Sequence, residues 1–151
     1  MSFQEKHITV TLVNFTLIMG FLLIRVFQLI RNDSFNAPNV FRLWGIVIIL
    51  AVVVTVAATV LTMIVSAIIE AIKTGGKEPE IEDFKDERDT LIDLRGTKIT
   101  YTVSSLGSFV AMLTFVFGQP PLVMFTLLIF FGVLAQIMGD ISRLLLYRRG
   151  F

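Results

Sequence analysis

The strongest constraint on this fold is an uncharged apolar run at residues 45–65, GIVIILAVVVTVAATVLTMIV. Val and Ile favour strands in water, but this run is longer than any strand of a globular protein. A helix needs about 20 apolar residues to cross a bilayer core of ~30 Å, and its backbone groups hydrogen-bond within the segment. The run therefore predicts a transmembrane helix, with Trp44 at its start as an interfacial anchor.

Three further apolar stretches are long enough to cross a membrane. We predict spans at about residues 8–30, 43–72, 99–117 and 122–145. The first is too long for the apolar part of a signal peptide, and no basic segment precedes it. Mean hydropathy is +0.82 and 17% of the residues are charged, against roughly a quarter in soluble domains. The chain is therefore expected to form one all-α membrane domain over residues 1–151.

Two connections define the expected topology. Residues 118–121, Gly-Gln-Pro-Pro, leave so short a turn that spans three and four should form an antiparallel hairpin. Residues 73–98 form a charged linker that contains a Gly-Gly helix stop near its start and becomes amphipathic from Asp86 onward. We predict two antiparallel hairpins, with this short amphipathic segment between spans two and three.

Lys and Arg are distributed unevenly between the two sides of the predicted membrane domain. Cytoplasmic loops of membrane proteins carry an excess of these residues. The side that holds the linker and both termini has most of them, whereas the loop between spans one and two has only Arg31 and Arg42. We therefore place the linker and both termini in the cytoplasm.

Asp140 in span four is the first candidate functional residue. A carboxylate inside a membrane span is costly and is by default a hypothesis of function. Two interpretations are open. In the one we favour, Asp140 pairs with Arg143 three residues further on; in the other, it binds a proton or a cation.

Other polar residues lie at about the same depth as Asp140. Asn14 of span one, Ser104 of span three and Gln136 of span four all fall in the cytoplasmic half of the membrane. These residues are expected to form one buried polar layer. Such a layer either joins the helices through hydrogen bonds, each worth ~0.6–2 kcal/mol, or lines a transport site.

Arg25 is a second charged residue inside a span, in the outer half of span one. Long basic side chains near a span end extend toward water. We predict that Arg25 snorkels outward, toward Gln28 or Asp33. An anion site is the alternative.

Small residues recur at helical spacing on spans three and four, which permits two backbones to approach closely. Because the tight turn already makes these spans neighbours, we expect the small faces to meet each other; oligomer contacts are the alternative. The faces consist of Ser104, Gly107, Ser108 and Ala111 on span three, and Gly132, Ala135 and Gly139 on span four.

Composition excludes several classes of function. The chain has no Cys, which removes disulfides, thiol nucleophiles and Cys-ligated metals. The net charge is +1 and opposite charges interleave, so there is no basic patch for nucleic acid. The linker acids lack the spacing of a calcium loop, and His7 is the single His. No enzyme activity, metal or cofactor is predicted.

The linker ends in a charged motif that runs into span three: Asp86, Glu87, Arg88, Asp89, Thr90, Leu91, Ile92, Asp93, Leu94, Arg95 and Gly96. The motif and the two-plus-two layout resemble uncharacterised prokaryotic four-span membrane proteins, in which an Asp-Glu-Arg stretch precedes a polar third span. The resemblance implies an inner-membrane protein that acts as a partner or regulatory subunit. It brings no established activity to any residue.

The motif has two physical interpretations. Asp86 can cap a helix N-terminus, and Gly96 would let the chain change direction before span three. In this interpretation the segment is a surface helix that positions spans three and four. Alternatively it docks a cytoplasmic partner through its charged side chains, which are Asp86, Glu87, Arg88, Asp89, Asp93 and Arg95.

The leading functional hypothesis is a non-enzymatic membrane protein that serves as an interaction or regulatory subunit through this linker. Its expected partners are the lipid bilayer and a cytoplasmic or membrane protein. The alternative is a small transporter or channel lined by Asp140, Asn14 and Gln136. Four spans are few to enclose a pathway, so that function would require a homo-oligomer.

Overall fold

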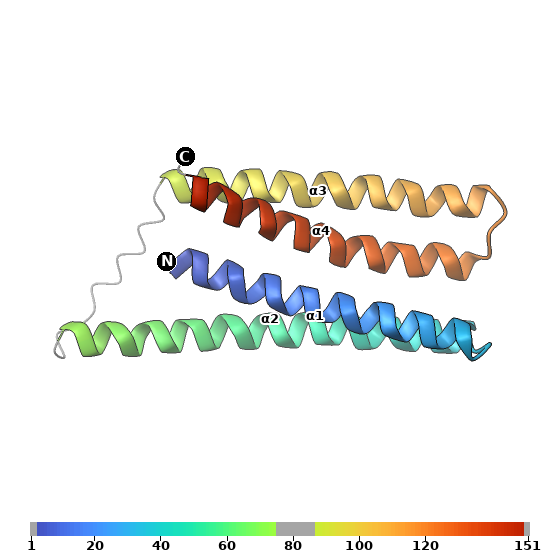
Figure 1. The fold of residues 1–151 in the computed structure, drawn as a ribbon, viewed down its shortest axis with the longest axis horizontal. Coiled ribbons are helices and arrows are strands. Elements are labelled where there is room, and N and C mark those ends of the chain that lie inside the picture. Colours follow the sequence, from blue (N-terminus) through green and yellow to red (C-terminus); the bar gives the residue numbers. More distant parts are fainter. Residues whose placement is uncertain (1–2, 75–86, 150–151) are drawn as a thin grey trace.

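The computed structural model describes residues 3–74 and 87–149, and within them the chain is helical with short connections (Figure 1). Each of the four helices is long and apolar enough to cross a membrane, as the sequence predicts. They are α1 (Phe3–Arg31), α2 (Ala37–Thr74), α3 (Glu87–Val116) and α4 (Pro121–Arg149).

The connection between α1 and α2 is fixed by two local motifs. Asp33 has a positive φ of 50°, and the amides of Asp33 and Ser34 donate to the carbonyls of Ile30 and Leu29. This is a Schellman ending, which satisfies carbonyls at a helix C-terminus. Asn36 then caps α2, because its side-chain oxygen accepts from the Asn39 amide at 3.1 Å.

A second Schellman ending closes α3. Gly118 has a φ of 81°, which glycine adopts without the steric cost of a Cβ. The Gln119 amide donates to the Thr114 carbonyl, and the Gly118 amide to that of Phe115. Pro121 is the first residue of α4, where its missing N–H costs nothing. The turn thus occupies residues 117–120, one position earlier than the sequence predicts.

The helices pack in the order α3, α4, α1, α2, with a smaller contact between α2 and α4. In the described part of the chain, no close backbone contact joins α3 to α1 or to α2. The start of α1, the end of α4 and the start of α3 lie at the same end of the molecule (Figure 1). We call this the terminal end, and the other the loop end.

The apolar core lies where α4 meets α1 and the first half of α2. Its buried members are Ile18, Met19, Leu22, Leu43, Val47, Ile129 and Val133. Trp44 reinforces this junction, since its indole Nε1 donates to the Phe125 carbonyl of α4 at 3.0 Å. The side chain is half-buried and joins two helices.

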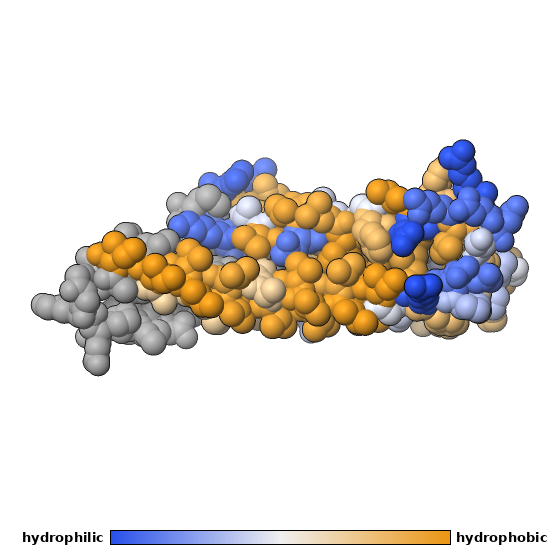
Figure 2. Space-filling model, turned by 90° about the horizontal axis from the view of Figure 1, so that it is seen from below, coloured by the Kyte–Doolittle hydropathy of each residue, from blue (hydrophilic) through white to orange (hydrophobic). Residues whose placement is uncertain are grey.

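The outer surface is apolar along the middle of the molecule. Figure 2 shows this band over α1 and α2, with hydrophilic residues gathered at the loop end. On α2, large side chains such as Ile49, Leu61 and Met63 are more than half exposed. Contact with lipid tails would leave such an apolar surface without a free-energy cost, whereas exposure of the same surface to water would be unfavourable.

The charged motif is not a separate surface segment in this structure. The helix α3 begins at Glu87 and continues without a break into the third span. Gly96 is buried inside this helix, so the expected change of direction does not occur there. Residues 75–86 of the linker, Asp86 among them, lie outside the described residues, as does the side chain of Glu70 near the end of α2.

Candidate functional site

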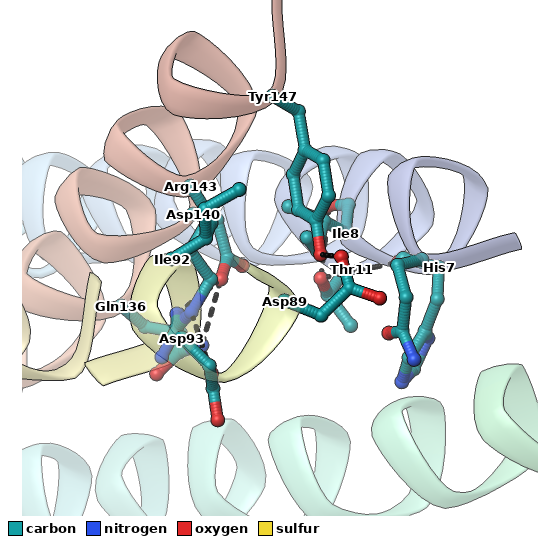
Figure 3. A pocket seen from close by; sticks show the side chains of 11 residues that line it. His7, Ile8, Thr11, Asp89, Ile92, Asp93, Gln136, Asp140, Arg143 and Tyr147 are labelled. Carbon is teal, nitrogen blue, oxygen red and sulfur yellow. Dashed lines mark hydrogen bonds and ion pairs between the residues drawn. The ribbon is translucent and has the colours of Figure 1, made fainter. Parts of the chain in front are cut away.

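A polar pocket of about 320 Å³ lies at the terminal end, between α1, α3 and α4 (Figure 3). Helix α1 contributes Gln4, His7, Ile8 and Thr11; α3 contributes Asp89, Ile92 and Asp93; and α4 contributes Gln136, Asp140, Arg143 and Tyr147.

Arg143 binds side chains on both walls made by α3 and α4. Its Nη1 donates to Asp140 Oδ1 at 2.9 Å, and its Nε to Asp93 Oδ1 at 3.1 Å. Its Nη2 donates to the Thr97 hydroxyl at 2.9 Å. Because the guanidinium is planar and carries five N–H donors, one side chain can satisfy three partners on two helices.

Small residues make room for Arg143. A Cβ on Gly96 of α3 would overlap the Arg143 side chain, meeting Nε at 2.7 Å and Cδ at 3.0 Å. A Cβ on Gly139 of α4 would overlap the Thr100 hydroxyl. That hydroxyl in turn donates to the Gly96 carbonyl at 3.2 Å. The two backbones approach closely here, as the small-residue pattern predicts.

Farther along the α3–α4 contact, a Cβ on Gly107 would overlap the Phe131 ring, and Ala111 and Ala135 are buried. Gly132 is different, since it is exposed and has open space around its Cα. The small faces therefore meet except at Gly132.

Asp140 is the most deeply buried charged residue among those described, with 2% of its surface exposed. Its Oδ1 accepts from Arg143 and also from Gln136 Nε2 at 3.2 Å. Its Oδ2 is buried and has no hydrogen-bond partner within the described residues. The Thr11 hydroxyl faces Asp140 but donates to backbone carbonyls of its own helix, Ile8 at 2.9 Å and His7 at 3.3 Å.

A second set of contacts ties the start of α3 to the end of α4. The Tyr147 hydroxyl donates to Asp89 Oδ1 at 2.8 Å. The Arg88 guanidinium reaches the Tyr147 carbonyl at 3.5 Å. These bonds hold the first turns of α3 against the last turns of α4, so the charged motif carries part of the helix-positioning role expected for it.

The pocket lies at the edge of the apolar zone rather than at its centre. At 1.5 Å per residue, the 30 residues of α3 extend about 45 Å, which exceeds a bilayer core of ~30 Å. The excess lies at the charged start of α3, since the helix becomes apolar only from about Ile99. Asp89 and Asp93 thus lie in the charged first turns of α3, before its apolar part begins, and Asp140 of α4 lines the same pocket.

The structure brings together only part of the predicted polar layer. Gln136 and Asp140 are hydrogen-bonded to each other. Asn14 and Ser104 are half-buried and are not among the residues that line this pocket. Sequence reasoning missed Thr11, Thr97 and Tyr147 as members of the site.

The motif residues divide between two faces of α3. Asp89 and Asp93 point toward α4 and the pocket, and Arg88 reaches the α4 backbone. Glu87 and Arg95 are exposed. Together with the exposed Leu91, Leu94 and Lys98 they make up what we call the outer face of α3.

A second pocket, of about 340 Å³, lies at the loop end and has the opposite charge. Arg25 and Arg42 line it together with the polar residues Gln28, Asn32, Ser34 and Asn39. Arg25 Nη1 donates to Gln28 Oε1 at 3.3 Å, and its guanidinium lies 5.6 Å from the centre of the Phe21 ring. Arg25 is exposed, and its contact with Gln28 is one of the two that the sequence predicts.

Comparison with known proteins gives no guide to function: no family model, curated protein or solved structure matches this chain. Within residues 3–74 and 87–149, no three His, Cys, Asp or Glu side chains are grouped so that they could hold a metal ion. Function is therefore inferred from the pocket at the terminal end and from the outer face of α3.

Proposed function

We propose that this protein is a non-enzymatic membrane subunit that binds and regulates a protein partner through the outer face of α3. One observation carries the proposal. Leu91 and Leu94 are 48% and 60% exposed on a helical segment whose neighbouring side chains, Glu87, Arg95 and Lys98, are charged. Leucines framed by charges form the mixed surface that protein interfaces use, with an apolar centre and a polar rim.

The rigid support behind this face favours recognition. Asp89, Asp93 and Thr97, on the opposite side of the same segment, are hydrogen-bonded to Tyr147 and Arg143 of α4. A surface held in its binding conformation loses less conformational entropy on association than a mobile one. These contacts with α4 thus hold the outer face of α3 in one conformation for binding.

The proposed setting is a prokaryotic inner membrane, with two antiparallel hairpins and with the terminal end in the cytoplasm. The excess of Lys and Arg near the termini and the linker supports this orientation. The resemblance of residues 86–96 to motifs of four-span prokaryotic proteins supports the location. In this orientation the outer face of α3 meets the cytoplasm at the membrane surface.

Site-specific crosslinking in living cells tests the proposal. A photoreactive residue at position 91 or 94 should give a discrete protein adduct, whereas one at Leu17, which is 67% exposed on the apolar surface, should give lipid adducts. The charge reversals Glu87→Lys and Arg95→Glu should abolish the protein adduct, and Arg31→Glu at the loop end should leave it intact. Lipid adducts alone at positions 91 and 94 would contradict the proposal.

A second candidate function is that of an oligomeric transporter, which the buried Asp140 favours. The helices form an open row, in which α2 and α3 make no close backbone contact, so a closed pathway would need another copy. Flux of a cation or of protons in liposomes that Asp140→Asn abolishes, and that Asp33→Asn preserves, would support this function. Absence of flux together with the crosslink at position 91 would favour the partner-binding function.

A further inference from the structure

The pocket at the terminal end carries excess negative charge. Three carboxylates line it, those of Asp89, Asp93 and Asp140, against the single guanidinium of Arg143. With His7 neutral, the formal charge of the lining is −2. Near the low-dielectric interior such a charge is poorly screened, so the pocket attracts a cation.

Within the pocket, one oxygen of Asp140 is the acceptor available to a cation. Its Oδ1 already accepts two hydrogen bonds, from Arg143 and Gln136. Its Oδ2 is buried in the wall of the pocket and has no partner within the described residues. A buried polar atom left without a hydrogen bond is unfavourable, and a donor placed in the pocket would supply one.

The size and the walls of the pocket favour an organic cation over a metal ion. A volume of about 320 Å³ corresponds to roughly ten water molecules at ~30 Å³ each. Ca²⁺ requires six to eight oxygen ligands, and no suitable group of acids occurs in the described residues. An ammonium group, by contrast, has three N–H donors and can bind through one strong acceptor.

The remaining walls suit the carbon body of an amine. Ile8 of α1 and the buried Ile92 of α3 are the aliphatic side chains of the lining, and Tyr147 of α4 adds an aromatic ring. Figure 3 shows Tyr147 and Ile8 on the opposite side of the pocket from Asp140. An ammonium group at Asp140 would therefore leave its attached carbon chain facing these side chains.

We propose that this pocket binds a small organic amine in its protonated form, with the ammonium group donating to Asp140 Oδ2 and the carbon body lying between Ile8, Ile92 and the Tyr147 ring. This goes beyond the proposed function, because the partner surface is the outer face of α3 and the amine site lies on the inner face. The two proposals can therefore fail separately.

Ligand-observed fluorine NMR on the full-length protein in nanodiscs of zwitterionic lipid tests this site. The probe is 4-fluorobenzylammonium, and the neutral comparison compound is 4-fluorobenzyl alcohol, which has the same ring. Empty nanodiscs give the broadening caused by partition into lipid. We expect saturable broadening of the ammonium probe, with a Kd at least about tenfold lower than that of the alcohol.

Two variants assign the binding to the pocket. Asp140→Asn keeps the shape of the side chain and removes its charge, and should weaken binding of the ammonium probe at least about tenfold. Asp33→Asn makes the same change at an exposed position of the loop end, where Asn tolerates a positive φ, and should leave binding unchanged. Ile8→Trp fills the pocket from α1 without altering its charge, and should also abolish binding.

Circular dichroism shows whether each variant retains the wild-type helicity and cooperative unfolding. Equal affinity for the ammonium probe and the alcohol would overturn the proposal, as would wild-type binding by folded Asp140→Asn or Ile8→Trp protein. A pocket that holds only water would give no saturable binding of the ammonium probe to the wild type up to about 10 mM, and this result would overturn the proposal too.

Discussion

The side chain of Arg143 on α4 occupies the space that a side chain at Gly96 on α3 would need. Arg143 Nε lies 2.7 Å from the position of a Cβ at residue 96. The glycine thus lets the guanidinium cross to α3 and bond to Asp93 and Thr97. The two backbones approach closely at the polar network, since a Cβ on Gly139 would lie 3.3 Å from the Gly96 carbonyl oxygen.

Gly96→Ala should therefore destabilise the protein, although alanine is the better helix former. The added methyl group would displace Arg143, and such overpacking costs about 1–3 kcal/mol. Unfolding in mixed micelles of increasing denaturing detergent, followed by circular dichroism, measures the change. Gly132→Ala is the control, because open space surrounds Gly132, and it should be neutral or stabilising. Equal stability of the two variants would contradict this prediction, because it would mean that the Arg143 side chain can adopt another conformation at no cost.

Arg143→Met should be more damaging than Gly96→Ala. It removes the cation that pairs with Asp140, whose side chain is 3% exposed, and breaking a buried ion pair by removing one partner costs about 3–5 kcal/mol. The double variant Arg143→Met with Asp140→Asn should recover part of this loss, because the uncompensated buried carboxylate is then gone. The double variant Arg143→Met with Asp93→Asn should recover less of the lost stability, since the Asp93 side chain is 50% exposed and water can solvate it.

Tyr147→Phe should loosen the start of α3 while leaving the rest of the fold intact. The variant loses only the hydroxyl that donates to Asp89 at 2.8 Å, a bond whose net worth is about 0.5–1.5 kcal/mol. Hydrogen exchange of the amides at residues 88–93 should become faster. Tyr101→Phe is a matched control, because Tyr101 is 70% exposed and should change nothing. Unchanged exchange in Tyr147→Phe would mean that the other contacts with α4 suffice to hold this segment.

The sequence predicts the four helices because each apolar stretch exceeds the length that a bilayer requires, and that signal does not depend on tertiary contacts. Helix ends are less predictable. The second helix starts at Ala37, not near residue 43, because Asn36 caps it and Pro38 fits within a first helical turn. Similarly, α3 starts at Glu87, because polar residues continue a helix beyond the membrane once its first turn is stabilised.

The site is predictable only where it lies on one helix. Gln136, Asp140 and Arg143 are spaced by four and three residues, so helical periodicity alone places them together. The bonds from Arg143 to Asp93 and from Tyr147 to Asp89 depend on how α3 is aligned along α4, which Gly96 and Gly139 determine through close packing. Asn14 was expected beside Asp140 from depth alone, and depth gives no information about the direction in which a helix turns its side chains. Thr11 lines the pocket instead.

Membrane topology gives the last prediction, and the absence of Cys from the chain makes it simple to test. Gln119 is exposed in the turn between α3 and α4, and Glu87 is exposed at the start of α3. Gln119→Cys should react with a membrane-impermeant maleimide in intact cells, after removal of the outer membrane where one is present. Glu87→Cys should react only after the inner membrane is permeabilised.

The physical reason for this expectation is the distribution of positive charge. Arg88, Arg95, Arg148 and Arg149 lie at the terminal end, whereas the turn at residues 117–120 has no charged side chain; basic flanks stay on the cytoplasmic side during insertion. The reverse labelling pattern would place the outer face of α3 outside the cell. A cytoplasmic partner could then not reach Leu91 and Leu94, and the proposed function would be wrong even if the amine site were confirmed.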